Sequence, residues 1–137
     1  PADGQPVHNA LAKAVHRHRS FELFAQQSVK RVLFICNQNR LRSPTAEQVF
    51  ADYPGLEVAS AGTNNDAENP LTGELVEWAD MVVVMERQHK ARLQRKFRTS
   101  LRGQYIICSD IPNDYRFMDP ELVYLLTTRM ARHLPKT

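Results

Sequence analysis

Short apolar runs alternate along the chain with segments in which apolar residues recur every three or four positions. The runs are rich in β-branched residues and too short for helices, so they predict buried strands at residues 30–36, 56–62, 81–85 and 105–108. The intervening periodic segments predict helices near residues 43–53, 71–78, 86–101 and 119–130. Strands that alternate with helices predict a three-layer α/β/α fold around a four-stranded parallel sheet.

The predicted elements occupy residues 30–137 and are expected to form one α/β domain. Residues 1–29 precede the first strand, and we expect them to be an N-terminal extension, flexible or helical. A chain of 137 residues is long enough for one hydrophobic core. Ligands of such sheets bind beyond the carboxyl ends of the strands.

Composition narrows the class of protein. Hydrophobic residues make up 42% and charged residues 24% of the chain, as is usual for globular domains. No apolar run is long enough to cross a membrane, and no cleavable signal is evident. The two cysteines, Cys36 and Cys108, lie in separate strand-like runs, which argues against a zinc ribbon or a disulfide scaffold. We therefore expect a cytoplasmic protein.

The junction between the first predicted strand and the first helix carries the chemistry. Cys36 ends the strand, and Ser43-Pro44 is expected to start the helix, with the serine as its cap. A helix start binds anions and favours a thiolate over a thiol. Arg42 adds a planar fork that matches two phosphate oxygens. This spacing suits attack by sulfur on a bound phosphoryl group.

This stretch resembles the phosphate-binding loop of the low-molecular-weight protein tyrosine phosphatases. The resemblance extends over about residues 30–134 and includes Ser60-Ala61-Gly62-Thr63 and the run 79–86. It implies that Cys36 is the nucleophile, that Arg42 binds the phosphoryl oxygens, and that Ser43 donates to the thiolate. The rest of the loop would bind the substrate phosphate: Asn37, Gln38, Asn39, Arg40 and Leu41. Asn39 would hold the loop in an unusual backbone conformation.

The chain departs from the family pattern in three places. Gln38 replaces the usual glycine, which affects the detailed geometry of the loop. Leu41 replaces a second cysteine, which removes a partner for an oxidised nucleophile. The segment between Gly62 and Asp80 is also shorter than the family's usual form.

The general acid is expected after the fourth strand, where the family has an aspartate followed by proline. Asp110 lies at the strand exit and is the favoured acid. Asp119 precedes a proline, but this pattern is also typical of a helix cap, and Asp114 is a third alternative. Tyr115, in the same loop, is a candidate wall for an aromatic leaving group, although packing against the sheet explains it equally well.

The leading hypothesis is hydrolysis of phosphomonoesters through a phosphocysteine, with a phosphorylated protein or a small phosphate ester as substrate. No metal or cofactor is expected, because the loop and Arg42 supply the positive charge. The alternatives are a phosphate-binding or phosphocarrier module and, less favoured, an arsenate reductase. A basic run over residues 87–102 could steer an anionic partner, including nucleic acid, but a solvated helix face is the simpler interpretation.

Overall fold

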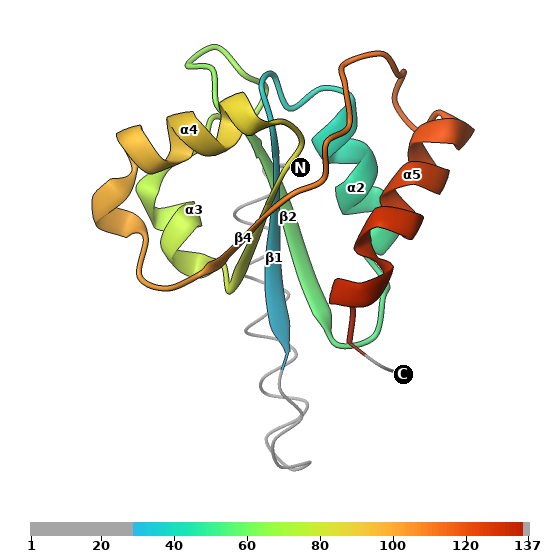
Figure 1. Cartoon of the computed structure of the whole chain (residues 1–137), viewed down its shortest axis with the longest axis horizontal. Coiled ribbons are helices and arrows are strands. Elements are labelled where there is room, and N and C mark those ends of the chain that lie inside the picture. Colours follow the sequence, from blue (N-terminus) through green and yellow to red (C-terminus); the bar gives the residue numbers. More distant parts are fainter. Residues whose placement is uncertain (1–28, 136–137) are drawn as a thin grey trace.

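The computed structural model describes residues 29–135, and all but the last residue of the predicted extension, residues 1–29, lies outside them. The strands of this part are β1 (Lys30–Cys36), β2 (Leu56–Gly62), β3 (Met81–Val84) and β4 (Tyr105–Cys108). The helices are α2 (Arg42–Phe50), α3 (Gly73–Trp78), α4 (Arg87–Lys96) and α5 (Pro120–Met130), with short 3₁₀ turns after α4 and α5. The elements alternate along the chain as the sequence predicts (Figure 1).

The four strands form one parallel sheet in the order β2-β1-β3-β4. The predicted three-layer fold with a four-stranded parallel sheet is therefore confirmed. Strand β2 lies on one side of β1, and β3 lies on the other side. The order of the strands therefore reverses at β1, and the carboxyl end of β1 lies at this topological switch point, where ligands of such sheets bind. Cys36 is the last residue of this central strand.

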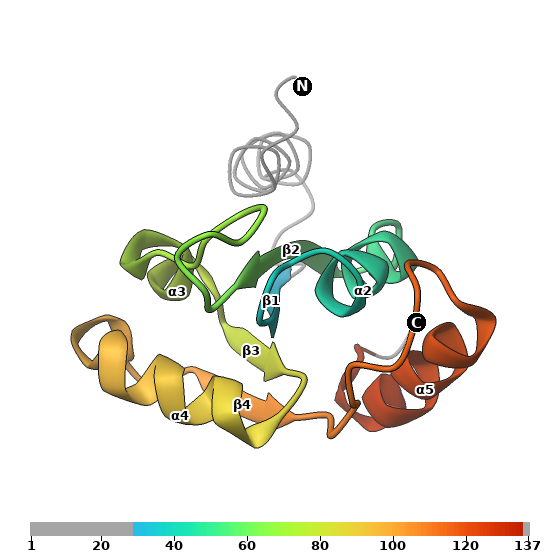
Figure 2. The same ribbon diagram turned by 90° about the horizontal axis from the view of Figure 1, so that it is seen from above.

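Alternating side chains of the strands build a core on each face of the sheet. Helices α2 and α5 cover one face, and helices α3 and α4 cover the other (Figure 2). Phe34 of β1 packs with Phe50 of α2 at a ring-centroid distance of 5.7 Å, while its neighbours Leu33 and Ile35 join the core under α3 and α4. This distribution explains why β1 is apolar throughout its buried length.

Three details differ from the sequence-based expectations. Helix α2 begins at Arg42, so Leu41 occupies the N-cap position without a side-chain cap, and Ser43 is not the cap. Helix α4 ends at Lys96, and Leu101 follows a 3₁₀ turn. Strand β4 lies at the edge of the sheet, where Tyr105 is 70% exposed. Within residues 29–135, no helix has the length and apolar character needed to span a membrane.

Candidate active site

The loop that joins β1 to α2 surrounds the thiol of Cys36. Cys36 is buried, and its Sγ lies 3.0 Å from the Oγ of Ser43 in the first turn of α2. Because the Ser43 hydroxyl is used here, it is not available to cap the helix. Asn39 already donates to this oxygen, so the single Ser43 proton is left for Cys36 Sγ or for the more distant Ala61 carbonyl at 3.4 Å. The serine can therefore stabilise a thiolate.

Asn39 holds the loop in shape from behind. Its backbone has a φ of 56°, a left-handed conformation that asparagine tolerates better than most residues. Its side-chain amide donates to Ser43 Oγ and to Ser60 Oγ, both at 2.9 Å. Ser60 in turn donates to Glu47 Oε1 at 2.5 Å. The expected role of Asn39 in the loop conformation thus has a physical basis in this network.

Gly62 at the end of β2 allows the loop to pass close to the sheet. A Cβ atom at this position would lie 2.5 Å from the Asn37 carbonyl oxygen and 3.0 Å from the Asn39 backbone nitrogen. The first distance is shorter than Cβ atoms show in practice, and the second is tighter than most of their contacts. The glycine is therefore required by the close approach of two backbone segments.

Arg42 is 1% exposed and its guanidinium is fixed by contacts from three segments. Nη1 donates to Glu86 Oε1 at 2.9 Å and to the Ile111 carbonyl at 2.7 Å, and Nη2 donates to Asn37 Oδ1 at 3.4 Å. Its Nε, in contrast, is buried and has no hydrogen-bond partner in the described part of the chain. A buried N–H without an acceptor is costly, so this donor favours a bound anion.

Glu86 at the N-cap of α4 supplies the counter-charge of Arg42. Burial alone raises the pKa of Glu86, but the hydrogen bond and the positive charge of Arg42 outweigh it and hold that pKa below its ordinary value. Glu86 is therefore ionised at neutral pH. The backbone N–H of Glu86 donates to His89 Nδ1 at 3.0 Å, which completes a capping box.

His89 is buried beside this ion pair and remains neutral. Burial, followed by the charge of Arg42, lowers the pKa of His89 from 6.5 to about 4, against the opposing effect of Glu86. Because Nδ1 accepts a hydrogen bond, the proton of the neutral ring is on Nε2. His89 therefore positions the start of α4 and contributes no charge near pH 7.

A cleft of about 180 Å³ opens at the thiol. Its lining consists of Cys36, Asn37, Gln38, Arg40, Leu41 and Arg42 together with Asn113 from the loop after β4. Within residues 29–135, the backbone N–H groups of Asn39, Arg40 and Leu41 donate to no protein acceptor. These N–H groups belong to the turn around the thiol at the start of α2, so the cleft can bind a tetrahedral oxyanion next to sulfur.

The structure therefore brings together most of the loop residues predicted from the sequence. Asn39 and Ser43 act behind the cleft and do not line it. Tyr115 is not among the lining residues and packs against the core under α5. Partial loss of solvation and the negative charges of Glu121, Asp114 and Asp119 raise the pKa of Tyr115, so its phenol is neutral.

None of the three candidate acids lines the cleft. Asp110 has a φ of 56°, and its Oδ1 lies 3.6 Å from the Cys108 thiol, whose pKa is raised by burial. Asp119 caps α5 by accepting from the Glu121 backbone N–H at 2.9 Å, as its alternative interpretation predicts. Asp114 is exposed and directly follows Asn113 in the chain.

Sequence reasoning did not identify Glu86, His89 and Asn113 as site residues. Glu86 directly follows the third predicted strand, residues 81–85, and lies two residues after the end of β3, so the end of a strand in a parallel sheet was the available signal. His89 lies three residues later, at the position where a capping box usually has a glutamate or glutamine. No cluster of three metal-ligating side chains occurs among the residues that the structure describes.

Comparisons with known proteins agree with this geometry. The family model described as low molecular weight phosphotyrosine protein phosphatase matches residues 31–78. The low molecular weight protein-tyrosine-phosphatase Etp of Escherichia coli K12 is 26% identical over 121 residues, which cover 67% of this chain and 82% of Etp. The protein-arginine-phosphatase of Bacillus subtilis 168 is 33% identical over 93 residues, which cover 48% of this chain and 62% of that protein.

Solved structures show the same fold. The tyrosine phosphatase Wzb from Escherichia coli K30, in complex with phosphate, superimposes with a TM-score of 0.62 at 22% identity, over 77% of this chain and 96% of Wzb. The YwlE mutant from Bacillus subtilis gives a TM-score of 0.60 at 25% identity, over 78% and 99% of the two chains. The matching sequence segment contains the loop from Cys36 to Arg42, and the family model and the curated relatives together indicate a phosphatase enzyme similar to the low molecular weight phosphotyrosine protein phosphatases.

Proposed function

We propose that this protein is a cysteine-dependent phosphomonoesterase that works through a phosphocysteine intermediate. One observation carries the proposal: Cys36, with its buried thiol, and Arg42, whose Nε–H has no partner within residues 29–135, line the same oxyanion-sized cleft. The Ser43 hydroxyl, 3.0 Å from the sulfur, supports the thiolate. A nucleophile, an electrophilic donor and a stabilising hydroxyl are therefore present in one loop.

In the first step, the Cys36 thiolate attacks phosphorus, so that an S–P bond forms while the P–O bond to the leaving group breaks. Arg42 and the free loop N–H groups stabilise the three equatorial oxygens, on which negative charge accumulates. The leaving oxygen takes a proton from an aspartic acid. In the second step, water attacks phosphorus of the phosphocysteine while the same aspartate, now ionised, takes a proton from it; a P–O bond forms, the S–P bond breaks, and phosphate and the thiolate are released.

The proton donor belongs to the segment that follows β4. Asp110 remains the first candidate. It lies two residues after the end of β4 and directly before Ile111, whose carbonyl accepts a hydrogen bond from Arg42. Asp114 is the second, because it is exposed and adjacent to Asn113 at the cleft. Asp119 is engaged as the cap of α5. Closure of this segment over a bound substrate would bring either of the first two carboxylates to the leaving group.

The proposed substrate is a phosphotyrosine residue of a protein. Arg40 lines the cleft, and its guanidinium pairs with the Glu68 carboxylate at 3.4 Å on the surface. A cation at this position disfavours a leaving group that is itself a cation, as in phosphoarginine, and accepts a neutral phenol. We expect a higher kcat/KM for a phosphotyrosine peptide than for the matched phosphoarginine peptide, and the reverse order would reassign the substrate.

The cellular setting follows from the thiol chemistry. A catalytic thiolate requires a reducing compartment, so we propose a cytoplasmic enzyme that meets its phosphoprotein substrates there. Both cysteines are free in the structure. The arsenate reductase alternative would need Cys108 as a second thiol, and the raised pKa of Cys108 makes it a poor attacking group.

Turnover of p-nitrophenyl phosphate tests the proposed activity. We expect release of p-nitrophenol by the parent protein, inhibition by vanadate, and loss of turnover in Cys36→Ser. Cys108→Ala, the matched control at the second cysteine, should keep most of the activity. Turnover by Cys36→Ser at the parental rate would contradict the proposal, and stoichiometric phosphorylation without turnover would favour the phosphocarrier alternative.

A further inference from the structure

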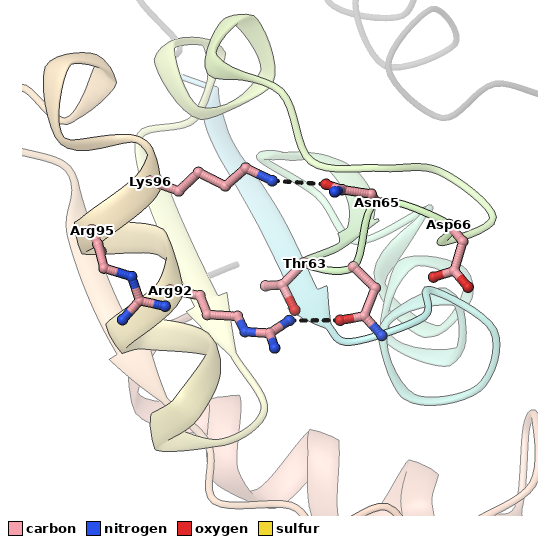
Figure 3. A pocket seen from close by; sticks show the side chains of 7 residues that line it. Thr63, Asn65, Asp66, Arg92, Arg95 and Lys96 are labelled. Atoms are coloured by element: carbon pink, nitrogen blue, oxygen red, sulfur yellow. Dashed lines mark hydrogen bonds between the residues drawn. The ribbon is translucent and has the colours of Figure 1, made fainter.

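A second and larger cleft lies next to the catalytic loop. It has a volume of about 610 Å³ and separates helix α4 from the loop that follows β2 (Figure 3). Arg92, Arg95 and Lys96 line it from the helix, and Thr63, Asn64 and Asn65 line it from the loop. Nothing in the phosphoryl transfer described above uses this space, which we call the α4 cleft.

The α4 cleft carries a concentrated positive charge. Arg95 and Lys96 follow Arg92 by three and four residues, so each of them is a neighbour of Arg92 on the surface of α4. Arg92 donates to Asn64 Oδ1 at 2.6 Å and Lys96 donates to Asn65 Oδ1 at 2.8 Å, but these amide oxygens are neutral and leave the charges uncompensated. Within residues 29–135, Arg95 has no hydrogen-bond or ion-pair partner. The cleft can therefore accept an anion without breaking an existing ion pair.

Asp66, the single carboxylate that lines the cleft among residues 29–135, does not neutralise these cations. Asp66 accepts a hydrogen bond from Gln38 Nε2 at 3.4 Å, on the side of the loop that faces the catalytic site. In Figure 3 its carboxylate points away from α4, whereas the side chains of Arg92 and Lys96 extend from α4 toward the loop. The field inside the cleft is consequently positive.

Thr63 provides an independent sign of a missing ligand. Its side chain is only 9% exposed, and its Oγ1 is buried without a hydrogen-bond partner in the described part of the chain. Thr63 lines the α4 cleft opposite the cations. A buried hydroxyl without a partner costs free energy, and an oxyanion bound in the cleft would accept a hydrogen bond from it.

The same loop touches the catalytic site directly. The backbone N–H of Thr63 donates to the Cys36 carbonyl and that of Asn64 to the Asn37 carbonyl, both at 3.0 Å. Along α4, Arg92 and Lys96 lie about 9 and 15 Å beyond Glu86, which binds Arg42, at a rise of 1.5 Å per residue. An extended peptide covers such a distance with about three to five residues, at roughly 3.3 Å each.

We propose that the α4 cleft is a second anion-binding subsite, which takes acidic side chains about three to five residues from the phosphorylated residue of a protein substrate. The proposal rests on the phosphatase function stated above and adds a preference for acidic sequences around the phosphorylation site. A peptide presents negative charge only where its acidic side chains lie. The carboxylates of Asp66, in the lining of the α4 cleft, and of Glu68, which pairs with Arg40 of the catalytic cleft, would repel the continuous phosphate backbone of a nucleic acid.

Two phosphotyrosine peptides test the subsite. One carries glutamates at three to five residues from the phosphotyrosine on both sides, and the other carries glutamines there. The readout is the ratio of kcat/KM for the acidic peptide to that for the neutral peptide. We expect a ratio on the order of ten for the parent protein at low salt, because two or three exposed ion pairs form, and a ratio near one at high salt.

Two double variants that remove the same charge test whether the preference for the acidic peptide arises in the α4 cleft. The double variant Arg92→Gln/Arg95→Gln should bring the ratio close to one. Arg98→Gln/Arg102→Gln removes the same charge from exposed positions beyond α4 and should keep the parental ratio. A parental ratio near one, or equal losses in both double variants, would overturn the proposal.

Direct binding separates a failure of the subsite from a failure of the phosphatase function. Anisotropy of the labelled, unphosphorylated acidic peptide should show binding to the full chain that is weakened by Arg92→Gln/Arg95→Gln, whether or not any phosphate ester turns over. Absence of p-nitrophenyl phosphate turnover would reject the phosphatase function alone. If a single-stranded oligonucleotide binds more tightly than the peptide and loses affinity in the same variant, the cleft binds nucleic acid and the peptide proposal is wrong.

Discussion

Replacing Glu86 by glutamine tests whether the buried Arg42 depends on a charged partner. The guanidinium is 1% exposed, and the Glu86 carboxylate, 2.9 Å away, is 32% exposed. Removing one partner of a fully buried ion pair costs about 3–5 kcal/mol, because an uncompensated charge remains in the interior. Glutamine keeps an acceptor oxygen, and water reaches position 86, so we expect the free energy of unfolding to fall by about 2 kcal/mol.

The pair between Arg40 and Glu68 offers a matched control. It joins the same two residue types at 3.4 Å, but its side chains are 60% and 63% exposed. Glu68→Gln should therefore lower the free energy of unfolding by less than about 0.5 kcal/mol. Urea unfolding at neutral pH, followed by circular dichroism, measures both variants.

Glu86→Gln should also lower catalytic activity more than Glu68→Gln does. Without the Glu86 charge, the Arg42 side chain is held less firmly by its remaining contacts with Asn37 and Ile111, so kcat/KM for p-nitrophenyl phosphate should fall more than tenfold in Glu86→Gln. If Glu86→Gln unfolds at the same urea concentration as Glu68→Gln and retains parental kcat/KM, Arg42 does not depend on this counter-charge.

Three further predictions concern His89, Gly62 and the general acid. The pKa of His89 is about 4 in the folded protein and 6.5 in the unfolded chain, so only the unfolded chain gains a proton between these values. The free energy of unfolding should therefore fall by at most about 3.4 kcal/mol as pH decreases through this range, and urea titrations of His89→Asn should lack this component. Gly62→Ala should destabilise the protein by about 1–3 kcal/mol and abolish turnover, since its Cβ would meet the Asn37 carbonyl; parental stability would contradict the close approach. Asp110→Asn should slow alkyl phosphates far more than p-nitrophenyl phosphate, and the same pattern in Asp114→Asn instead would identify Asp114 as the acid.

The sequence alone was sufficient to predict the strands, because each is an apolar run bounded by turn residues. Strand β2 agrees with the predicted range at both ends. Helix boundaries were less predictable where one side chain could serve two purposes. Ser43 has the residue type of a cap, yet its hydroxyl contacts Cys36, and nothing in the local sequence decides between these uses.

Long-range geometry limited the prediction of the site. The loop from Cys36 to Arg42 is contiguous, so its spacing alone indicated an oxyanion site. Glu86 and Ile111 reach Arg42 from distant parts of the chain, and their contact depends on the order of the strands, which apolar runs do not specify. For the same reason the edge position of β4 was not predictable.

The most direct test of the central claim is to detect phosphate on Cys36 during turnover. The protein is mixed with a phosphotyrosine peptide, quenched in acid within the first turnovers, and digested for mass spectrometry. The account predicts a phosphoryl group on the peptide that contains Cys36, which disappears as substrate is exhausted and is never found in Cys36→Ser. Turnover without any phosphorylated Cys36, or a phosphoryl group on another residue of the active protein, would contradict nucleophilic attack by this thiol.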